Sequence, residues 1–338
     1  MDFNFFSKQP TRREMLRASS AMIGGGLFAG LMPDFVGAAS RPESSWPASQ
    51  QAAAGGNDRV AQMRAQGAAI PLKVQKLRDN IYMLSGPGGN MAALDGPDGK
   101  VMVDSSYSPA TPKIIAALTG ISNTPLKFLI NTHWHLDHTD GNAPLHEAGA
   151  FIFAHENTRK RLSSPQDIVA FGLHLDTTPV AAWPQQTFTD NMALYLDNES
   201  IHLGYMPPAH TDTDIYVHYQ HTNVLHMGDI FFNGMYPFID AGTKGNISGM
   251  IAGADKGISL SDGDTIVIPG HGPVADKAAL TKYRDMMATV RDRVQTQKAA
   301  GKSLEVVKSS KPTAEFDAVF GKGMIPPDAF VAEVFSTL

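Results

Sequence analysis

The chain has 338 residues, of which 43% are hydrophobic, and a formal net charge of −5. This length is enough to bury one large core, and the absence of a long basic block excludes a nucleic-acid surface or a polybasic membrane contact. The sequence contains no cysteine, which excludes thiol nucleophiles, disulfide redox chemistry and iron–sulfur ligation. We therefore expect a globular protein whose partner is a small-molecule substrate.

The N-terminus has the pattern of an export signal. Arg12 and Arg13 precede a small, apolar stretch, residues 18–31, that is too short and glycine-rich for a comfortable membrane span. A signal peptidase would cleave after Ala38 or one residue later, so we predict a twin-arginine signal peptide over residues 1–38. The expected location is periplasmic or secreted, with no stable membrane association after cleavage. A retained N-terminal anchor helix is the alternative.

The next segments predict a linker and then short strands. Residues 39–71 are rich in Ala, Gly, Ser and Pro, which indicates a linker with one weak helix near residues 60–65. Turn residues over 95–99 predict a hairpin connection, and prolines open a helix at 109–118. The short apolar runs that predict the strands of this half are residues 72–77, 81–84, 90–94, 101–103 and 126–130.

A second half repeats the order of strands followed by a helix. Residues 139–148 predict a helix, and the connection 162–184 has little clear periodicity and predicts a flap or a capping insertion. Apolar positions over 275–297 recur on one face of an amphipathic helix. The predicted strands of this half are residues 151–154, 192–196, 200–203, 215–219, 224–227 and 266–268.

Two such halves predict an α+β fold, a four-layer αββα sandwich that spans residues 72–300. The remaining segment, residues 301–338, predicts a C-terminal extension of two or three short helices. We expect this extension to pack on the core, with a role in dimerisation or as a lid as the alternative.

The densest group of chemically active side chains follows the strand predicted over residues 126–130. His133, His135, Asp137 and His138 lie within six residues of one another at the end of this strand. Side chains at positions i and i+2 of a strand end can converge on one ion, while the next two turn toward a second. The pattern predicts a metal site at this strand end.

Three more residues of the same chemical types stand at the ends of later apolar runs. His210, Asp229 and His271 each stand in or beside a segment that contains glycine or proline, where strands give way to loops. Seven ligands are enough for two metals. Imidazole and carboxylate without thiolate suit Zn2+ best, so we expect two Zn2+ ions, with Fe or Mn as the alternatives.

With these residues in this order, the chain resembles the metallo-β-lactamase-fold superfamily and its His-x-His-x-Asp-His signature. The resemblance extends from about residue 72 to about residue 294. It implies two metal sites that share one carboxylate: His133, His135 and His210 for the first metal, Asp137, His138 and His271 for the second, and Asp229 as the bridge.

The bridging Asp229 is similar to that of the glyoxalase II type and related sulfur-metabolism hydrolases, although the C-terminal basic residues of a glutathione site are absent. The resemblance implies hydrolysis of an ester, thioester or lactone by a metal-bridging hydroxide that Asp137 orients. True zinc β-lactamases generally lack a carboxylate at the bridging position, so Asp229 argues against antibiotic hydrolysis as the evolved activity. A class B-like β-lactamase is one alternative. A non-haem di-iron redox enzyme and a non-catalytic metal-binding periplasmic protein are the others.

The segment that follows Asp229 is the candidate wall of a substrate pocket. It is aromatic, and it contains Asn233 and Tyr236, which we predict as hydrogen-bond donors to substrate. An apolar loop that packs on the core is the alternative interpretation of the same residues.

Replacing both Arg12 and Arg13 with Lys should block export, because twin-arginine targeting recognises the guanidinium pair rather than positive charge alone. We expect uncleaved precursor to accumulate inside the cell, and fractionation with antibody detection measures it. Unchanged export of this variant would mean that the chain leaves by another route or stays inside.

Overall fold

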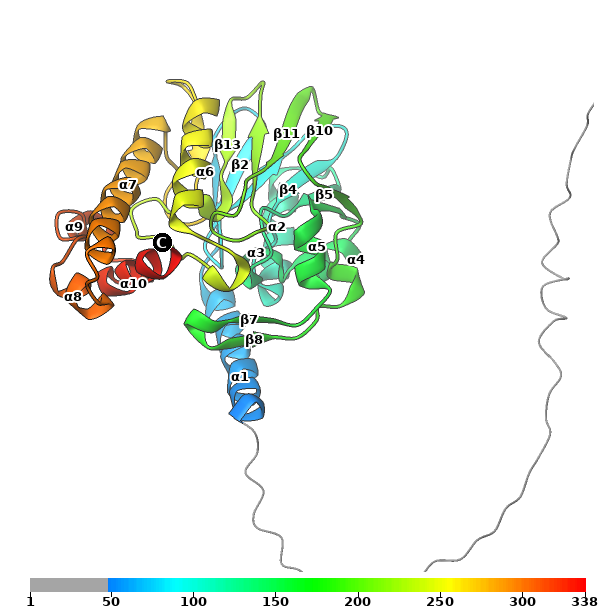
Figure 1. Cartoon of the computed structure of the whole chain (residues 1–338). Coiled ribbons are helices and arrows are strands. Elements are labelled where there is room, and N and C mark those ends of the chain that lie inside the picture. Colours follow the sequence, from blue (N-terminus) through cyan, green and yellow to red (C-terminus); the bar gives the residue numbers. More distant parts are fainter. Residues whose placement is uncertain (1–47) are drawn as a thin grey trace, which may run out of the picture. The chain divides into compact units, whose positions relative to one another are not determined.

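The computed structural model describes residues 48–338, with side chains from residue 58 onward. The predicted signal peptide, residues 1–38, lies outside this range. Two β-sheets pack face to face, and helices cover the outer side of each sheet (Figure 1). The predicted α+β four-layer sandwich is confirmed.

The first sheet has seven strands in the order β1-β2-β3-β4-β5-β6-β9. Neighbours from β1 to β4 are antiparallel, whereas β4, β5, β6 and β9 are parallel to one another. The parallel strands end at the same edge of the sheet, which brings the loops after β4 and β5 together. The strands are β1 Lys73–Lys76, β2 Ile81–Ser85, β3 Met91–Leu94, β4 Lys100–Val103, β5 Leu126–Ile130, β6 Phe151–His155 and β9 Gln186–Phe188.

The second sheet has five strands in the order β10-β11-β12-β13-β14. Its pairs are antiparallel except for β13 and β14, which are parallel and therefore end at one edge. The strands are β10 Asn191–Leu196, β11 Glu199–Tyr205, β12 Ile215–Tyr219, β13 Val224–His226 and β14 Ile266–Ile268.

The central core lies between the two sheets. Ile81 and Ile130 of the first sheet are fully buried in one cluster with Val217 and Ile268 of the second. Leu129, one residue before Ile130, instead faces the helices on the outer side. This alternation follows from the two-residue period of a strand, and it explains why buried strands such as β5 end in consecutive apolar residues.

Helices form the two outer layers. α2 and α4 cover the first sheet, and α6, α7 and α10 cover the second. The helices are α1 Ala48–Ala69, α2 Thr111–Ile121, α3 Leu136–Thr139, α4 Asn142–Glu147, α5 Glu156–Leu162, α6 Ile247–Leu260, α7 Lys277–Ala299, α8 Leu304–Ser309, α9 Asp317–Phe320 and α10 Pro327–Thr337. Short 3₁₀ turns are η2 Ser108–Ala110, η3 Val169–Phe171, η4 Val180–Ala182, η5 Gly228–Ile230 and η6 Ala241–Thr243.

The helix predicted over residues 139–148 corresponds to α4, and a separate short helix, α3, precedes it within the ligand loop. The chain turns between them at Gly141, whose backbone N–H donates to the carbonyl of Ser106 at 2.9 Å. A side chain at Gly141 would collide with the backbone oxygen of Ser105, so glycine is required for this close approach. The break places two candidate ligands, Asp137 and His138, on the short helix α3.

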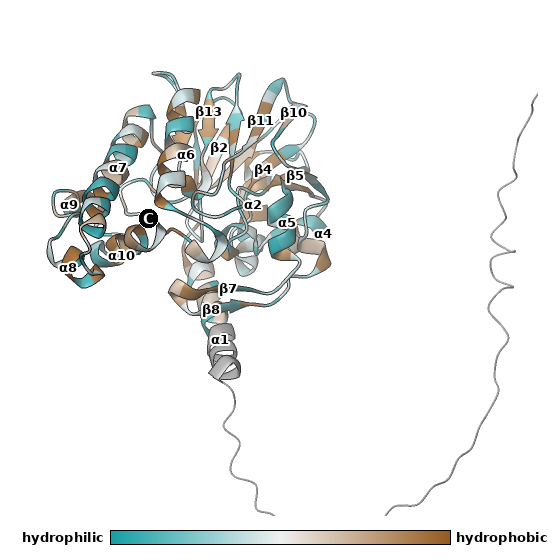
Figure 2. Ribbon diagram, viewed as in Figure 1, coloured by the Kyte–Doolittle hydropathy of each residue, from teal (hydrophilic) through white to brown (hydrophobic). Residues whose placement is uncertain are grey.

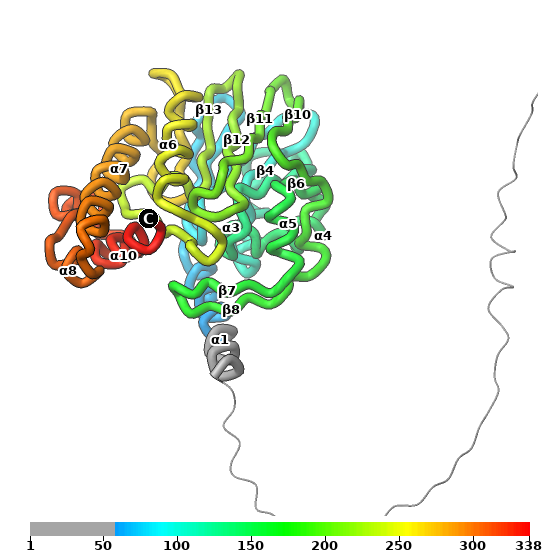
Figure 3. The backbone as a smooth tube through the Cα atoms, in the orientation of Figure 1, coloured from blue at the N-terminus to red at the C-terminus, as the bar shows by residue number. Residues whose placement is uncertain are grey.

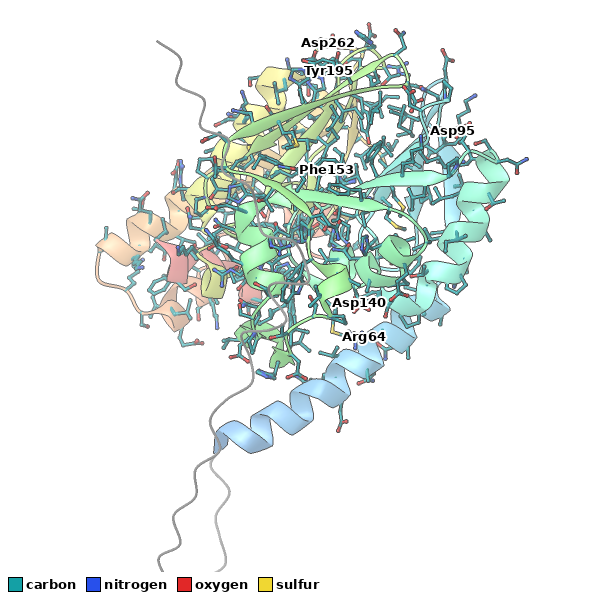
Figure 4. The ribbon with its side chains drawn as sticks, turned by 90° about the vertical axis from the view of Figure 1, so that its right-hand side faces the viewer. Arg64, Asp95, Asp140, Phe153, Tyr195 and Asp262 are labelled. Carbon is teal, nitrogen blue, oxygen red and sulfur yellow. The ribbon has the colours of Figure 1, made fainter. Side chains whose placement is uncertain are left out.

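Helix α1 corrects the prediction that residues 39–71 form a linker with a weak helix near 60–65. Residues 48–69 form one long helix that contacts β8 and η2. Val60 is buried, and the Arg64 guanidinium pairs with Asp140 at 2.6 Å (Figure 4). Tertiary burial and this ion pair stabilise a segment whose composition alone indicated flexibility.

The connection 162–184 contains a small hairpin, β7 Gln166–Ile168 and β8 Leu173–Leu175, which lies across α1 (Figure 3). Its tip is hydrophobic (Figure 2). In the C-terminal extension, Phe330, Val331 and Val334 of α10 are buried against α7 and α8. Among the described residues, no helix combines the length and apolar character that crossing a bilayer requires.

Glu333 ties α10 to the loop before η6. Its Oε2 accepts a hydrogen bond from the backbone N–H of Ile239 at 3.0 Å, and burial raises its pKa to about 8. The folded protein therefore binds this proton more tightly than the unfolded chain between about pH 4.5 and pH 8. Within that window the carboxyl makes the protein less stable as the pH rises.

Glu333→Gln keeps the oxygen acceptor and removes the titration. We expect the free energy of unfolding of the variant to fall less steeply between pH 5 and pH 8, by up to about 1.4 kcal/mol per pH unit. Urea unfolding across this range, with the exposed Glu305→Gln as a control, measures the difference. Parallel curves for wild type and Glu333→Gln would contradict the raised pKa.

Candidate metal centre

The seven predicted ligands lie at one end of the sandwich. His133, His135, Asp137 and His138 follow the end of β5, and His210 lies in the connection from β11 to β12. The other two, Asp229 and His271, follow β13 and β14. Because β13 and β14 are parallel, their carboxyl ends meet at the same edge of their sheet.

Side chains of His133, His135, His210 and Asp229 form one cluster. Each offers a ligand atom, and the four atoms all lie within 4.8 Å of one another. His135 Nδ1 is 2.8 Å from His210 Nε2, and His210 Nε2 is 3.5 Å from Asp229 Oδ2. All four residues are buried.

Asp137, His138 and His271 form a second cluster with the same spacing limit. Asp229 lies between the clusters, because its Oδ1 is 3.1 Å from His138 Nε2 and its Oδ2 is 3.3 Å from His271 Nε2. The structure therefore brings all seven predicted residues together. Two adjacent groups of N and O atoms around one shared carboxylate are compatible with divalent metal binding.

His135 and His210 each use one ring nitrogen for a hydrogen bond outside the first cluster, and the other ring nitrogen faces into the cluster. His135 Nε2 donates to Asp240 Oδ2 at 3.1 Å, and His210 Nδ1 donates to the carbonyl of Phe238 at 2.8 Å. In the neutral rings, the nitrogens that face each other, His135 Nδ1 and His210 Nε2, then carry lone pairs. Two lone pairs at this distance repel each other, and a cation beside them would offset this repulsion because both lone pairs are attracted to it.

A buried carboxylate orients the other half of the ligand loop. Asp104 Oδ2 accepts hydrogen bonds from His138 Nδ1 at 2.8 Å and from Thr132 Oγ1 at 2.7 Å, while its Oδ1 accepts from the Thr132 backbone N–H. Thr132 Oγ1 in turn accepts from His133 Nδ1 at 3.0 Å. The remaining nitrogen, His133 Nε2, is buried in the cluster without any hydrogen-bond partner. An unpartnered buried nitrogen of this kind fits a metal ligand.

The pKa values show the electrostatic character of the two clusters. Burial lowers the pKa of His133 well below its usual value, and burial with the facing His135 lowers that of His210 to about 4, so both rings are neutral near pH 7. At His271, burial alone would lower the pKa, but Asp229 and Asp137 raise it to about 10. These carboxylates give the second cluster the negative potential that attracts a cation.

The hydrogen-bond donors of the two predicted substrate residues are engaged elsewhere in this structure, although Tyr236 lines the cavity beside the clusters. Asn233 donates from Nδ2 to the carbonyl of Pro273 at 2.9 Å and so fixes the loop that carries His271. Tyr236 donates from its hydroxyl to Asp317 Oδ1 at 2.8 Å, and its ring stacks on Phe330. The C-terminal extension, whose contacts are not visible in sequence, engages this hydroxyl.

Three residues of the site were not predicted from the sequence. Asp104 and Asp240 each hold an imidazole, and Tyr107 lines the cavity beside Asp137. Asp104 follows the apolar strand β4 as Asp229 follows β13, which is the one local signal that could have identified it. For Tyr107 the signal is tertiary, because its ring packs against Gly67 of α1.

The comparisons with known proteins agree with this geometry. Residues 85–271, more than half of the chain, match the model of the metallo-beta-lactamase superfamily, so the chain belongs to that superfamily.

Similar solved structures include a metallo-beta-lactamase from Pontibacter korlensis, which is 15% identical with a TM-score of 0.54 over 64% of this chain and 99% of that one. DIM-1 metallo-beta-lactamase is 20% identical, with a TM-score of 0.51 over 65% and 99% of the two chains. The stereoselective inverting sec-alkylsulfatase Pisa1 from Pseudomonas sp. is 14% identical, with a TM-score of 0.59 over 78% of this chain and 50% of that one. At these identities the similarity shows the fold.

Asp229→Asn should weaken metal retention far more than Asn233→Ala. The first change removes a buried charge between the clusters, and the second removes one hydrogen bond to the Pro273 carbonyl. We expect retention of divalent metal to fall at least about tenfold for Asp229→Asn. Mass spectrometry of the metal in natively purified protein measures it, and a greater loss in Asn233→Ala would place the shared ligand elsewhere.

Proposed function

We propose that the protein is a binuclear zinc hydrolase that cleaves an ester, a thioester or a lactone, in a branch of the superfamily similar to glyoxalase II. The observation that carries the proposal is the position of Asp229 between two ligand clusters. A site for a single metal ion would not require the second cluster of Asp137, His138 and His271. Zinc is the metal that best suits five imidazoles and two carboxylates without a thiolate.

Two divalent cations in this site would polarise a substrate carbonyl and make a bound water acidic enough to attack it near neutral pH. The protein supplies the groups that orient the reactants. Burial raises the pKa of Asp137, but His138 and His271 outweigh this and lower it to about 2, so the carboxylate is ionised. It lines the cavity, where it can accept a hydrogen bond from the attacking water.

Tyr107, which lines the same cavity near Asp137, can also support the reaction. Burial and the charge of Asp137 raise its pKa, so the phenol stays neutral and keeps its proton. It can therefore donate a hydrogen bond to the oxygen on which negative charge develops. Phe232, whose ring stacks on His271 with centroids 5.3 Å apart, helps to exclude bulk water.

The charge of Asp229 favours good leaving groups. A carboxylate between two cations tightens the pair, but it lowers the net positive charge that can stabilise a departing amide nitrogen. Thiolates and alkoxides depart with less help. This argument places β-lactams below esters and thioesters as substrates, and it makes β-lactamase activity the second candidate.

The non-haem di-iron redox enzyme and the metal-binding protein without turnover remain alternatives that metal analysis and a substrate panel separate. We also propose export by the twin-arginine route, on the strength of Arg12 and Arg13. A chain that folds and binds its metals before transport does not need cysteine for stability outside the cell.

The protein loaded with about two zinc ions per chain should hydrolyse an activated thioester, ester or lactone with kcat/KM well above that for a penicillin or a carbapenem. Steady-state kinetics on this panel, with an alkyl sulfate added, measures the preference. Asp229→Asn serves as the inactive control. Comparable kcat/KM values for a β-lactam and the best ester would favour the second candidate, β-lactamase activity. Full occupancy by iron would contradict the zinc proposal.

A further inference from the structure

The ligand clusters open into a large cavity of about 720 Å³. Its floor contains His135, Asp137, Asp229 and His271. Its walls include helix α1, the β7–β8 hairpin, the segment after β13 and the C-terminal extension. This volume lies in the range of about 300–1,000 Å³ that accommodates small-molecule ligands.

The walls of this cavity are mainly apolar. The apolar side chains include Met63 from α1 and Ile70 just after it, Ile168 and Phe171 from the hairpin region, and Met324 and Ile325 from the extension. Arg59 is the one Lys or Arg among the lining residues in the described part of the chain, and its Nη1 donates to the carbonyl of Phe171 at 2.5 Å. The cavity therefore lacks the array of cations that a polyanionic substrate would require.

An apolar path connects the ligand clusters to the hairpin. The Phe238 ring lies beside His135, with centroids 5.8 Å apart, and packs against the Phe171 ring at 4.6 Å. A group attached to a carbonyl at the clusters and directed along these rings meets mainly carbon surface, and the polar side chains of Gln62 and Gln66 on α1 also line the cavity. Burying methylenes there is favourable, whereas burying hydroxyls or charges without partners is costly.

We propose that the substrate of this site carries a flexible apolar chain several methylenes long, which lies between α1 and the β7–β8 hairpin while its ester, thioester or lactone group lies at the clusters. The proposal rests on the hydrolase function proposed above and names its substrate class. Met63, Met235 and Met324 are unbranched and polarizable, so they can adapt to chains of different length.

Chain-length dependence tests this inference. We expect kcat/KM for p-nitrophenyl esters to rise about three- to fourfold for each added methylene from acetate to decanoate, until the cavity is filled. The affinities of the straight-chain carboxylates, measured by calorimetry below their critical micelle concentrations, should follow the same trend. This second measurement requires no turnover.

Phe171→Ala removes a wall residue and should flatten both trends. Val169→Ala is the matched control, because Val169 lies on the same turn, is 79% exposed and does not line the cavity. It should leave both trends unchanged. Met63→Gln tests the opposite wall on α1 and should again flatten them, which keeps the test valid if one variant folds poorly.

The outcomes separate this inference from the proposed function. Length-dependent binding of carboxylates without hydrolysis of any ester would support the apolar cavity and refute the hydrolase. Equal kcat/KM for acetyl and decanoyl esters, with no effect of Phe171→Ala or Met63→Gln, would overturn the apolar-chain substrate and leave the hydrolase standing. An equal effect of Val169→Ala would place the chain on the outer surface and overturn the proposed position.

Discussion

The geometry of the ligand loop after β5 depends on one buried carboxylate, Asp104. It stands at the end of β4 and binds Thr132 at the end of β5 and His138 on α3, so it joins three pieces of backbone. Its own backbone has a φ of 60°, a left-handed conformation that is costly for a residue other than glycine. The hydrogen bonds that it accepts offset this strain, and they explain why an aspartate can occupy the position.

In this arrangement, the groups that orient the ligand imidazoles are different from the groups that would coordinate a metal. Asp104 accepts a hydrogen bond from His138 Nδ1, and Asp240 accepts one from His135 Nε2. The other nitrogen of each ring therefore faces its cluster even without a bound metal. The rings therefore lose little freedom when a cation binds, and a larger part of the binding free energy remains for affinity. Asp229 is different, because it lies within 3.3 Å of histidines in the second cluster and belongs to the centre itself.

Much of the centre could be predicted because its ligands follow a local rule. Apolar runs that end in His or Asp mark the strand ends where His133, Asp229 and His271 stand, and the period of buried strands predicts the sandwich. Tyr236 shows where this reasoning ends. Its position beside the centre is local, but the direction of its hydroxyl depends on Asp317, 81 residues further along the chain.

The same limit applied to α1. Its Ala- and Gly-rich composition is compatible with a linker, and the contacts that make it a helix, such as Arg64 with Asp140, come from residues 76 positions away. No sequence pattern within the helix predicts a partner that lies so far along the chain. The predictions that failed are thus those in which a long-range polar contact, rather than burial of a strand face, determines the structure.

Helix α1 lies outside residues 85–271, the span that matches the superfamily, and yet it forms a wall of the cavity beside the ligands. One part of the cavity wall is therefore encoded outside the stretch that carries the ligands, although the hairpin and the segment after β13 contribute other parts from within it. Substitutions in α1 can reshape what the cavity admits without disturbing Asp104, Asp229 or the histidines that they contact. Under the proposed function, a change in this segment would alter which substrates fit while the ligand clusters stay as they are, and a comparison confined to the shared domain would not detect it.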